Sequence, residues 1–416
     1  MSTIARTLAQ AKSLYRAGQL RDAERLYREV LAADPGNAEA HHNLGGVLSQ
    51  QDRSDEAAAC YRRTLELEPG NAAAHHNLAV VLVHGGRLEE ALPFHRRAIA
   101  LRGDSTEIHC ALGGTLLMMG RLVEGWPEYE WRWKLAGTRE PPRQCPRWTG
   151  TALAGRTILL DCEQAYGDTL QFIRYAELLK QQGATVIVEC LGAVESLLAR
   201  CPGVDRVVVA GQPLPDVDVH IPLLSLPTMF RTSLESIPAN VPYLRPDAAL
   251  VATWKNELRG RRALKIGIAW QGNPGQASDR FRSFPLAQFA RIARMPDVQL
   301  YSLQMGSGRE QLSALGEPSP VVDLGDRLGD FHNTAAIVSN LDLLITCDSA
   351  PAHLAGALGV NVWVALTMIP DWRWMLGRND SPWYPSMRLF RQTGPGDWDA
   401  VFQNIQEALG ELVPGR

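Results

Sequence analysis

The stretch LDLLITCDSAPAHLAGALGVNVWVAL, residues 341–366, decides the fold of the C-terminal part of this chain. Its pattern is typical of a buried strand over 343–346, a polar turn, a helix over 350–359 and a second buried strand over 362–366. Pro351 suits the first turn of a helix, where its missing N–H costs nothing, and Gly359 is a common helix stop. We therefore predict one strand–helix–strand unit of a parallel sheet.

The predicted helix starts at Ala350, and its free N–H groups and positive dipole end lie just beyond the first strand. This environment suits a diphosphate. Ser349 adds a hydroxyl donor, and His353, one turn into the helix, points toward the same mouth. On spacing alone, an ordinary unit capped by Asp348 and Ser349 is the alternative.

The composition is that of a globular protein. The 416 residues are 45% hydrophobic and 21% charged, which allows two or three domains. A formal charge of -3 argues against a nucleic-acid partner. We expect a cytoplasmic protein without a transmembrane segment, because no run of about 18 apolar residues occurs and the first ten residues lack an apolar signal core. Seven scattered cysteines without a CxxC pair indicate reduced thiols.

The first third of the chain, residues 1–135, repeats every 34 residues. The repeated positions are leucine (Leu14, Leu48, Leu82, Leu116), small (Ala23, Ala57, Ala91, Gly125) and mostly aromatic (Tyr27, Tyr61, His95, Tyr129). The pattern predicts about four pairs of amphipathic helices. Period and positions resemble tetratricopeptide repeats, which stack into an all-α solenoid with an extended binding surface.

Two asparagines, Asn43 and Asn77, occupy equivalent positions of successive repeats. This resembles the asparagine-lined groove of eukaryotic protein O-linked N-acetylglucosamine transferases. A side-chain amide can pair with a peptide backbone of any sequence, so we expect a protein or peptide partner in the groove. A solvated polar face is the alternative, and Ala111 interrupts the pattern in the fourth repeat. The 34-residue spacing explains five histidines as repeated helix positions rather than metal ligands: His41, His42, His75, His76 and His109.

After the repeats, residues 136–155 are rich in proline and predict a linker. Strands and helices then alternate in two series, residues 156–248 and 263–390. This alternation predicts two Rossmann-like domains with parallel sheets, which makes the fold class α plus α/β. Residues 391–416 predict a C-terminal helix that packs back on the first of these domains.

The run DSAPAHLAGALG at residues 348–359 resembles the nucleotide-sugar motif of the lipopolysaccharide heptosyltransferase family, glycosyltransferases with the GT-B pair of Rossmann-like domains. The resemblance covers most of residues 156–410. It implies that a sugar passes from a nucleoside-diphosphate donor to an acceptor hydroxyl. It also implies donor contacts from Asp348, Ser349, Ala350 and His353.

The loop at residues 270–285 is rich in Gly, Asn, Ser and Arg, and the resemblance places its Arg282 on the donor diphosphate. A guanidinium there neutralises the leaving group without a metal ion, so we expect no cofactor. Arg280 is the competing candidate. Gln304 and Thr334 lie at strand and helix ends on the same edge and are expected to shape the nucleobase and ribose pocket. The DxD match at residues 216–218 is expected to be polar residues of a strand edge rather than a metal site.

In the first domain, Gly167 and Asp168 precede a predicted helix. The pair resembles the heptosyltransferase motif whose aspartate deprotonates the acceptor hydroxyl. It makes Asp168 the candidate general base and places Gln164 and Gly167 in the acceptor loop. A plain helix N-cap is the alternative role for Asp168. Tyr166 departs from the aliphatic residue of the family, which narrows the acceptor pocket.

Fold alone does not fix chemistry, so a second interpretation stays open beside the enzyme. It is a non-catalytic tetratricopeptide adaptor with a vestigial nucleotide-sugar site. The segment at residues 371–374, Asp-Trp-Arg-Trp, is expected either to close over the sugar or to form core at a domain junction.

Overall fold

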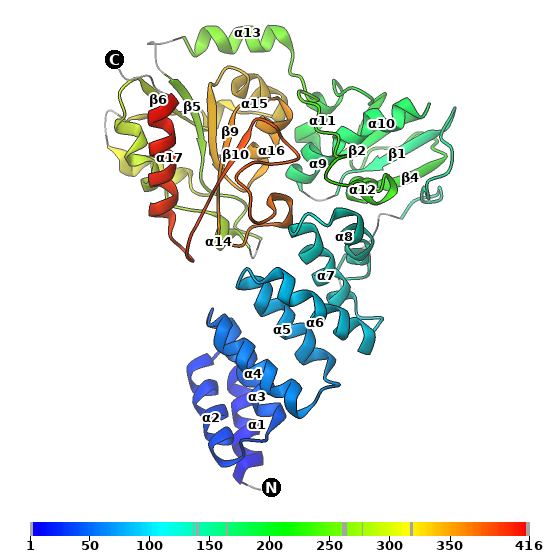
Figure 1. Ribbon diagram of the computed structural model, residues 1–416. Coiled ribbons are helices and arrows are strands. Elements are labelled where there is room, and N and C mark those ends of the chain that lie inside the picture. The colour runs from blue at the N-terminus through cyan, green and yellow to red at the C-terminus, as the bar shows by residue number, and fades with distance from the viewer. Residues whose placement is uncertain are drawn as a thin grey trace. The chain divides into compact units, whose positions relative to one another are not determined.

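The computed structural model describes residues 3–135, 137–138, 140, 142–163, 165–259, 264–276, 278–316 and 319–412. The chain forms two units (Figure 1). The first holds Met1–Arg139 and the short segment Asp371–Leu376, and the second holds Glu140–Pro370 and Gly377–Arg416. Helical repeats followed by parallel sheets confirm the predicted α plus α/β class. Over the described ranges, no helix has the length and apolar character needed to cross a membrane.

The first unit consists of consecutive helix pairs, one pair for each 34-residue repeat (Figure 1). The helices are α1 (Thr3–Arg16), α2 (Leu20–Ala33), α3 (Ala38–Gln50), α4 (Ser54–Leu67), α5 (Ala72–His84), α6 (Leu88–Leu101), α7 (Thr106–Met118) and α8 (Leu122–Tyr129). Small residues let the two helices of a pair approach closely. A Cβ atom on Gly45 would lie 2.8 Å from the Tyr61 ring, and one on Gly113 would lie 2.7 Å from the Tyr129 backbone nitrogen.

Repeated histidines brace the turns that precede the first helices of the repeats. Each ring nitrogen Nε2 lies within hydrogen-bonding distance of a carbonyl oxygen six residues earlier: His41 to Pro35 at 3.0 Å, His75 to Pro69 at 3.0 Å, and His109 to Gly103 at 3.1 Å. These bonds explain why histidine recurs at this position.

Exposed ion pairs join successive repeats with the same spacing. They are Arg28 with Glu56 at 3.4 Å, Arg62 with Glu90 at 2.6 Å, and Arg96 with Glu124 at 3.7 Å. Exposed pairs of this kind each contribute only about 0–1 kcal/mol. The alignment of successive repeats is therefore fixed mainly by the buried contacts, and the ion pairs add little to it.

The segment Asp371–Leu376 belongs to the first unit although it lies between two strands of the second. Trp372 packs edge-on against Trp126, with ring centres 5.3 Å apart, and the Leu376 N–H donates to the Met118 carbonyl oxygen at 3.1 Å. The aromatic segment is therefore core of the last repeat in this structure.

The first sheet of the second unit has strand order β3-β2-β1-β4, with all strands parallel. Its elements are β1 (Thr157–Asp161), α9 (Tyr166–Phe172), α10 (Ala176–Gln181), β2 (Thr185–Cys190), α11 (Glu195–Leu198), β3 (Arg206–Val209), β4 (Val219–Pro222) and α12 (Leu226–Met229). The helix predicted over residues 168–182 is divided into α9 and α10 by a 3-10 turn at Ile173–Tyr175.

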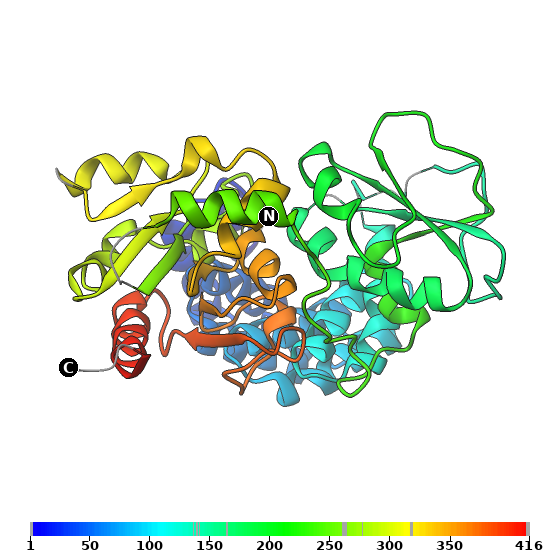
Figure 2. The same ribbon diagram turned by 90° about the horizontal axis from the view of Figure 1, so that it is seen from above.

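The second sheet has strand order β10-β9-β8-β5-β6-β7, again all parallel. Figures 1 and 2 show the second unit from two directions. The elements are β5 (Leu264–Ala269), α14 (Asp279–Arg282), β6 (Val298–Ser302), β7 (Val321–Asp323), α15 (Phe331–Val338), β8 (Leu343–Cys347), α16 (Ala350–Ala357), β9 (Val362–Leu366), β10 (Met387–Arg391) and α17 (Trp398–Leu412). This is the Rossmann order 3-2-1-4-5-6, with its switch point between β5 and β8. The predicted pair of Rossmann-like sheets is confirmed, and β10 is an unpredicted sixth strand.

The C-terminal helix α17 packs on the second sheet, so its predicted return to the first domain is wrong. Its Trp398 and Phe402 rings lie 4.9 Å and 5.0 Å from the Phe284 ring. Both belong to the same buried cluster as Ile266 and Phe390 of the sheet. Between the two sheets, α13 (Ala248–Glu257) carries Trp254, whose indole N–H donates to an oxygen of Asn333 on α15 at 2.8 Å.

Low pH should lower the stability of the folded repeats because of His95, which occupies the position that tyrosine has in the other repeats. The ring is fully buried, and burial lowers its pKa from 6.5 to about 3. Below pH 6.5 the unfolded chain therefore binds a proton that the folded repeat excludes. About 2 kcal/mol of stability should be lost between pH 7 and pH 5. When the free energy of unfolding is measured with urea at pH 7 and at pH 5, its decrease between the two should be smaller for His95→Tyr than for the parent protein. Equal losses would contradict this role.

Candidate functional site

The mouth of α16 lies at the carboxyl end of β8. Ser349 precedes the helix in an extended conformation, with φ -156° and ψ 172°, and its side chain makes no capping bond to the helix. The Ser349 hydroxyl instead donates to the Cys347 carbonyl oxygen at 3.3 Å. The predicted start at Ala350 matches the structure. Ser349 thus does not cap the first turn, in which Pro351 has no N–H and the Ala352 N–H donates to the Ser349 carbonyl oxygen at 3.0 Å. The positive end of the helix dipole suits an anion.

Arg282 lies near this mouth on the loop that follows β5. Burial raises the pKa of the Cys347 thiol to about 12, and the charges of Asp348, Arg282 and Asp279 act on the same thiol. The guanidinium is partly buried; its Nε donates to Asp279 at 3.2 Å and its Nη2 donates to Gln276 at 2.7 Å. The loops after β5 and β8 therefore place Arg282 and Asp348 close enough to Cys347, the last residue of β8, for both charges to act on its thiol. Arg280, the competing residue, lies over the Phe281 ring at 4.4 Å.

Gln304 is buried and its amide braces two loops. The amide oxygen accepts from the backbone N–H groups of Trp270 and Gln271, both at 3.1 Å, and the amide nitrogen donates to the Ser307 carbonyl oxygen at 2.8 Å. The Thr334 side chain is also hydrogen-bonded within the protein, since its hydroxyl donates to the Asp330 carbonyl oxygen at 2.9 Å. Both side chains therefore brace the loops at this edge of the sheet, and their predicted role in shaping a nucleobase and ribose pocket stays a prediction.

The two halves of the second unit meet at Gly167 and His353. A Cβ atom on Gly167 would lie 2.9 Å from Cδ2 of the His353 ring, so only glycine allows this approach. The Nδ1 atom of His353 lies 3.0 Å from the Tyr384 hydroxyl. Beside this contact, the Tyr166 ring packs against Phe331 with centres 4.8 Å apart. The loop after β1 that carries Gly167 and the α16 helix are therefore neighbours.

Asp168 is the third residue of α9 and is partly buried. The N-cap position is occupied by Ala165, so the alternative role of Asp168 as an N-cap is wrong. A carboxylate in the first turn still interacts favourably with the helix dipole. Gln164 falls outside the described residues.

Arg174 joins both halves and was missed by the sequence analysis. Its guanidinium is buried; Nη1 donates to the Trp383 carbonyl oxygen at 2.7 Å and Nη2 donates to the Tyr243 hydroxyl at 2.8 Å. The Tyr243 and Tyr384 rings each lie 4.6 Å from its Cζ atom. One arginine among apolar helix residues gives no sign of such a role in a single sequence.

A buried charge network holds the predicted linker against the first sheet. Arg143 pairs with Asp161, the last residue of β1, and with Glu189 of β2. The Nδ1 atom of His220 on β4 lies 2.8 Å from the second Asp161 oxygen. In the sequence, this network could have been predicted from the carboxylates at or next to the ends of two buried strands, TILLD and TVIVEC. Asp218 of the DxD match accepts from the Thr157 N–H at 2.7 Å, at the opposite end of this sheet.

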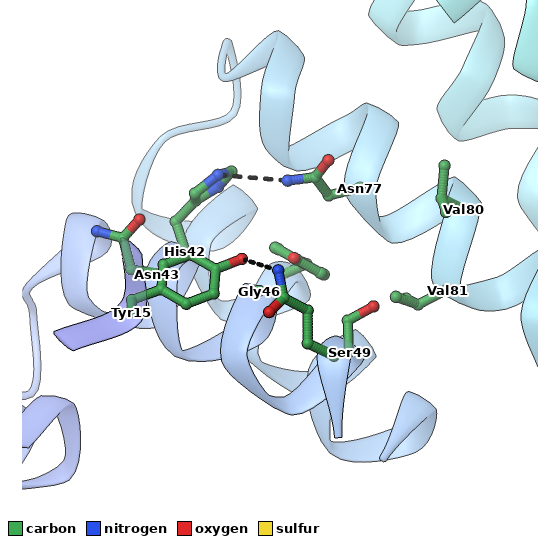
Figure 3. Close-up of a pocket in the computed structure, with 10 residues that line it drawn as sticks. Tyr15, His42, Asn43, Gly46, Ser49, Asn77, Val80 and Val81 are labelled. Carbon is green, nitrogen blue, oxygen red and sulfur yellow. Dashed lines mark hydrogen bonds between the residues drawn. The ribbon is translucent and has the colours of Figure 1, made fainter. Parts of the chain in front are cut away.

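A pocket of about 240 Å³ opens between the first helices of the first three repeats (Figure 3). Its lining residues come from α1, α3, α4 and α5: Tyr15, His42, Asn43, Gly46, Ser49, Gln50, Tyr61, Asn77, Val80 and Val81. The predicted partner residues Asn43 and Asn77 thus face one cavity. We call this cavity the groove pocket.

Two hydrogen bonds frame the groove pocket (Figure 3). The Gln50 amide donates to the Tyr15 hydroxyl at 3.2 Å, and the amide nitrogen of Asn77 lies 3.4 Å from Nε2 of His42. Burial lowers the pKa of His42, so the ring is neutral at pH 7. The pocket is therefore polar and uncharged.

Comparison with known families identifies the repeats. Residues 14–79 and 72–103 match sequence models of the tetratricopeptide repeat. The N-terminal region is a tetratricopeptide repeat array. Such arrays support a role in protein interaction.

The chain is also similar to a curated protein over most of its length and to solved structures of repeat proteins over about a third of it. The chain is 29% identical to protein FlbA of Caulobacter vibrioides over 331 residues, which are 69% of this chain and 52% of FlbA. It thus spans about half the length of this relative. The crystal structure of MamA covers 32% of this chain and 77% of its own, at 19% identity and a TM-score of 0.31. YrrB, described as a TPR protein with an unusual peptide-binding site, covers 31% and 66%, at 25% identity and a TM-score of 0.29.

Adding one methyl group at Gly167 should disturb the contact between the two halves of the second unit and lower the stability of the protein. Gly167→Ala places a Cβ atom against the buried His353 ring, and overpacking of this kind costs about 1–3 kcal/mol. The matched control is Gly410→Ala on α17, where no atom lies within 4 Å of the new Cβ. Thermal unfolding should show a loss for the first variant and none for the second. A Gly167→Ala protein as stable as its parent would contradict the contact.

Proposed function

We propose that the α/β unit is a glycosyltransferase. It moves a sugar from a nucleoside-diphosphate donor to an acceptor hydroxyl, and the repeat array recruits the protein that is substrate or partner. One observation carries the proposal: an uncapped helix start and Arg282 share the switch point of a sheet in Rossmann order. Open α/β sheets bind their ligands at this point.

The donor diphosphate is assigned to the Ala350 N–H, at the positive end of the α16 dipole, and to Arg282. Both neutralise the charge that develops on the leaving diphosphate, which is where electrostatic stabilisation lowers a barrier most. Arg282 pairs with Asp279 and Gln276 in this structure, and a diphosphate would compete for the same guanidinium. The chemistry needs no metal ion, because these groups carry the compensating charge.

The acceptor is assigned to the side of α9. Asp168 follows Gly167, which touches His353 of α16, so the carboxylate belongs to the element nearest the donor mouth. In the proposed step the acceptor oxygen bonds to the anomeric carbon as the bond to the diphosphate oxygen breaks. Asp168 takes the hydroxyl proton as general base.

A non-catalytic adaptor is the second candidate. The observation in its favour is the closed contact of Gly167 with His353 and of Tyr166 with Phe331, at the place assigned to the substrates. Gln304 and Thr334 are also bonded within the protein. In this case the repeat array is the functional part, and the α/β unit is a vestigial sugar-nucleotide domain.

Replacing the proposed base should separate the two candidates. Asp168→Asn keeps the side-chain volume, and loss of a general base lowers turnover by about 10² to 10⁴. The matched control is Asp397→Asn, since Asp397 is another aspartate at a helix start; it precedes α17 and accepts from the Ala400 N–H at 3.1 Å. Transfer of labelled sugar to a cell-extract acceptor pool should fall in the first variant alone.

Donor affinity should be equal in all three proteins, measured by calorimetry. Equal turnover by parent and Asp168→Asn would remove this residue from the mechanism. Absence of transfer by the parent with every nucleotide sugar tested would favour the adaptor.

A further inference from the structure

We propose that the groove pocket takes one uncharged apolar side chain of an extended peptide, whose backbone pairs with the amides of Asn43, Gln50 and Asn77. The inference rests on the partner-binding role proposed for the repeats and specifies its chemistry. It also makes the second and third repeats the specificity-determining part of the array.

The size of the pocket fits a side chain. Its volume of about 240 Å³ exceeds the 150 Å³ or so of an engineered protein cavity that holds a benzene molecule. Gly46 keeps this space open, because a Cβ atom there would lie 2.8 Å from the Tyr15 hydroxyl. Val80 occupies the same repeat position on α5 and forms another part of the lining.

The lining has an apolar part and a polar rim. Tyr61, Val80 and Val81 supply apolar surface, and the amides of Asn43, Gln50 and Asn77 belong to the same lining. Asn43 makes no side-chain hydrogen bond within the described part of the chain, and Gln50 uses only its amide nitrogen. Free amide donors and acceptors match the N–H and carbonyl groups of a peptide whatever its sequence. The apolar part is left for one anchoring side chain.

Charge decides which side chains are excluded. None of the residues that line the pocket carries a formal charge at pH 7, His42 included. A charged anchor would lose its hydration without gaining a partner, which is strongly unfavourable. The binding strength should therefore come from apolar burial and neutral hydrogen bonds, both of which respond weakly to salt.

Peptides selected from a random phage-displayed library on the immobilised full chain provide the test. The enriched peptides should share an aliphatic or aromatic position with uncharged neighbours. Their dissociation constants, measured by fluorescence anisotropy, should change less than about twofold between 50 and 500 mM salt. Asn43→Ala and Asn77→Ala should each weaken binding about fivefold, the factor for one lost hydrogen bond.

The decisive variant fills the pocket. Val80→Trp should weaken binding at least about tenfold, because burial of one large apolar side chain contributes about that factor or more. Val123→Trp is the matched control, since Val123 is exposed on α8 and lies outside the lining. Circular dichroism should show both variants folded.

Two outcomes would overturn the inference and leave a partner-binding role intact. One is a charged consensus with salt-sensitive affinity, and the other is binding that Val80→Trp leaves unchanged. Failure to enrich any peptide over an unrelated immobilised protein would instead contradict the partner-binding role itself.

Discussion

The α/β unit depends on one buried cation, the guanidinium of Arg174. It bonds to Tyr243 in the connection between the sheets and to Trp383 in the connection between β9 and β10, and it lies over the Tyr243 and Tyr384 rings. A buried charge is tolerated only while its hydrogen bonds are made, and facing aromatic rings add about 2 kcal/mol or more at desolvated sites. Separating the halves would break these contacts together. Arg174 therefore holds the α9 and α16 helices in the contact that defines the proposed site.

The two proposed sites rest on different physical principles. The switch point between β5 and β8 gathers backbone N–H groups and one arginine, so it is suited to negative charge. The groove pocket gathers neutral amides and apolar rings, so it is suited to a peptide without charge. A protein with both can select its partner through one unit and perform chemistry in the other. The separation also means that variants of each site can be tested independently.

Strict periodicity made the repeats predictable, and buried apolar runs revealed nine of the strands. The strand β10 was missed because two arginines interrupt the apolar residues of its sequence, MRLFR. It can contain these charges because it lies at the edge of the sheet. The amphipathic pattern of α17 indicates that one face of the helix is buried, but it does not indicate which sheet covers that face. Candidate residues at strand ends were found by position, whereas the partners of Gln304 and Thr334 depend on contacts that no local pattern contains. Arg174 was hidden for the same reason.

Hydrogen–deuterium exchange by the full chain, with and without a panel of nucleoside-diphosphate sugars, tests the central claim most directly. A donor held at the switch point should slow amide exchange at residues 348–353, 272–276 and 278–283, because the diphosphate would accept hydrogen bonds from the start of α16 and from Arg282. Exchange in the repeats should not change. Unaltered exchange in all of these segments with every donor, or protection confined to other parts of the chain, would contradict the account.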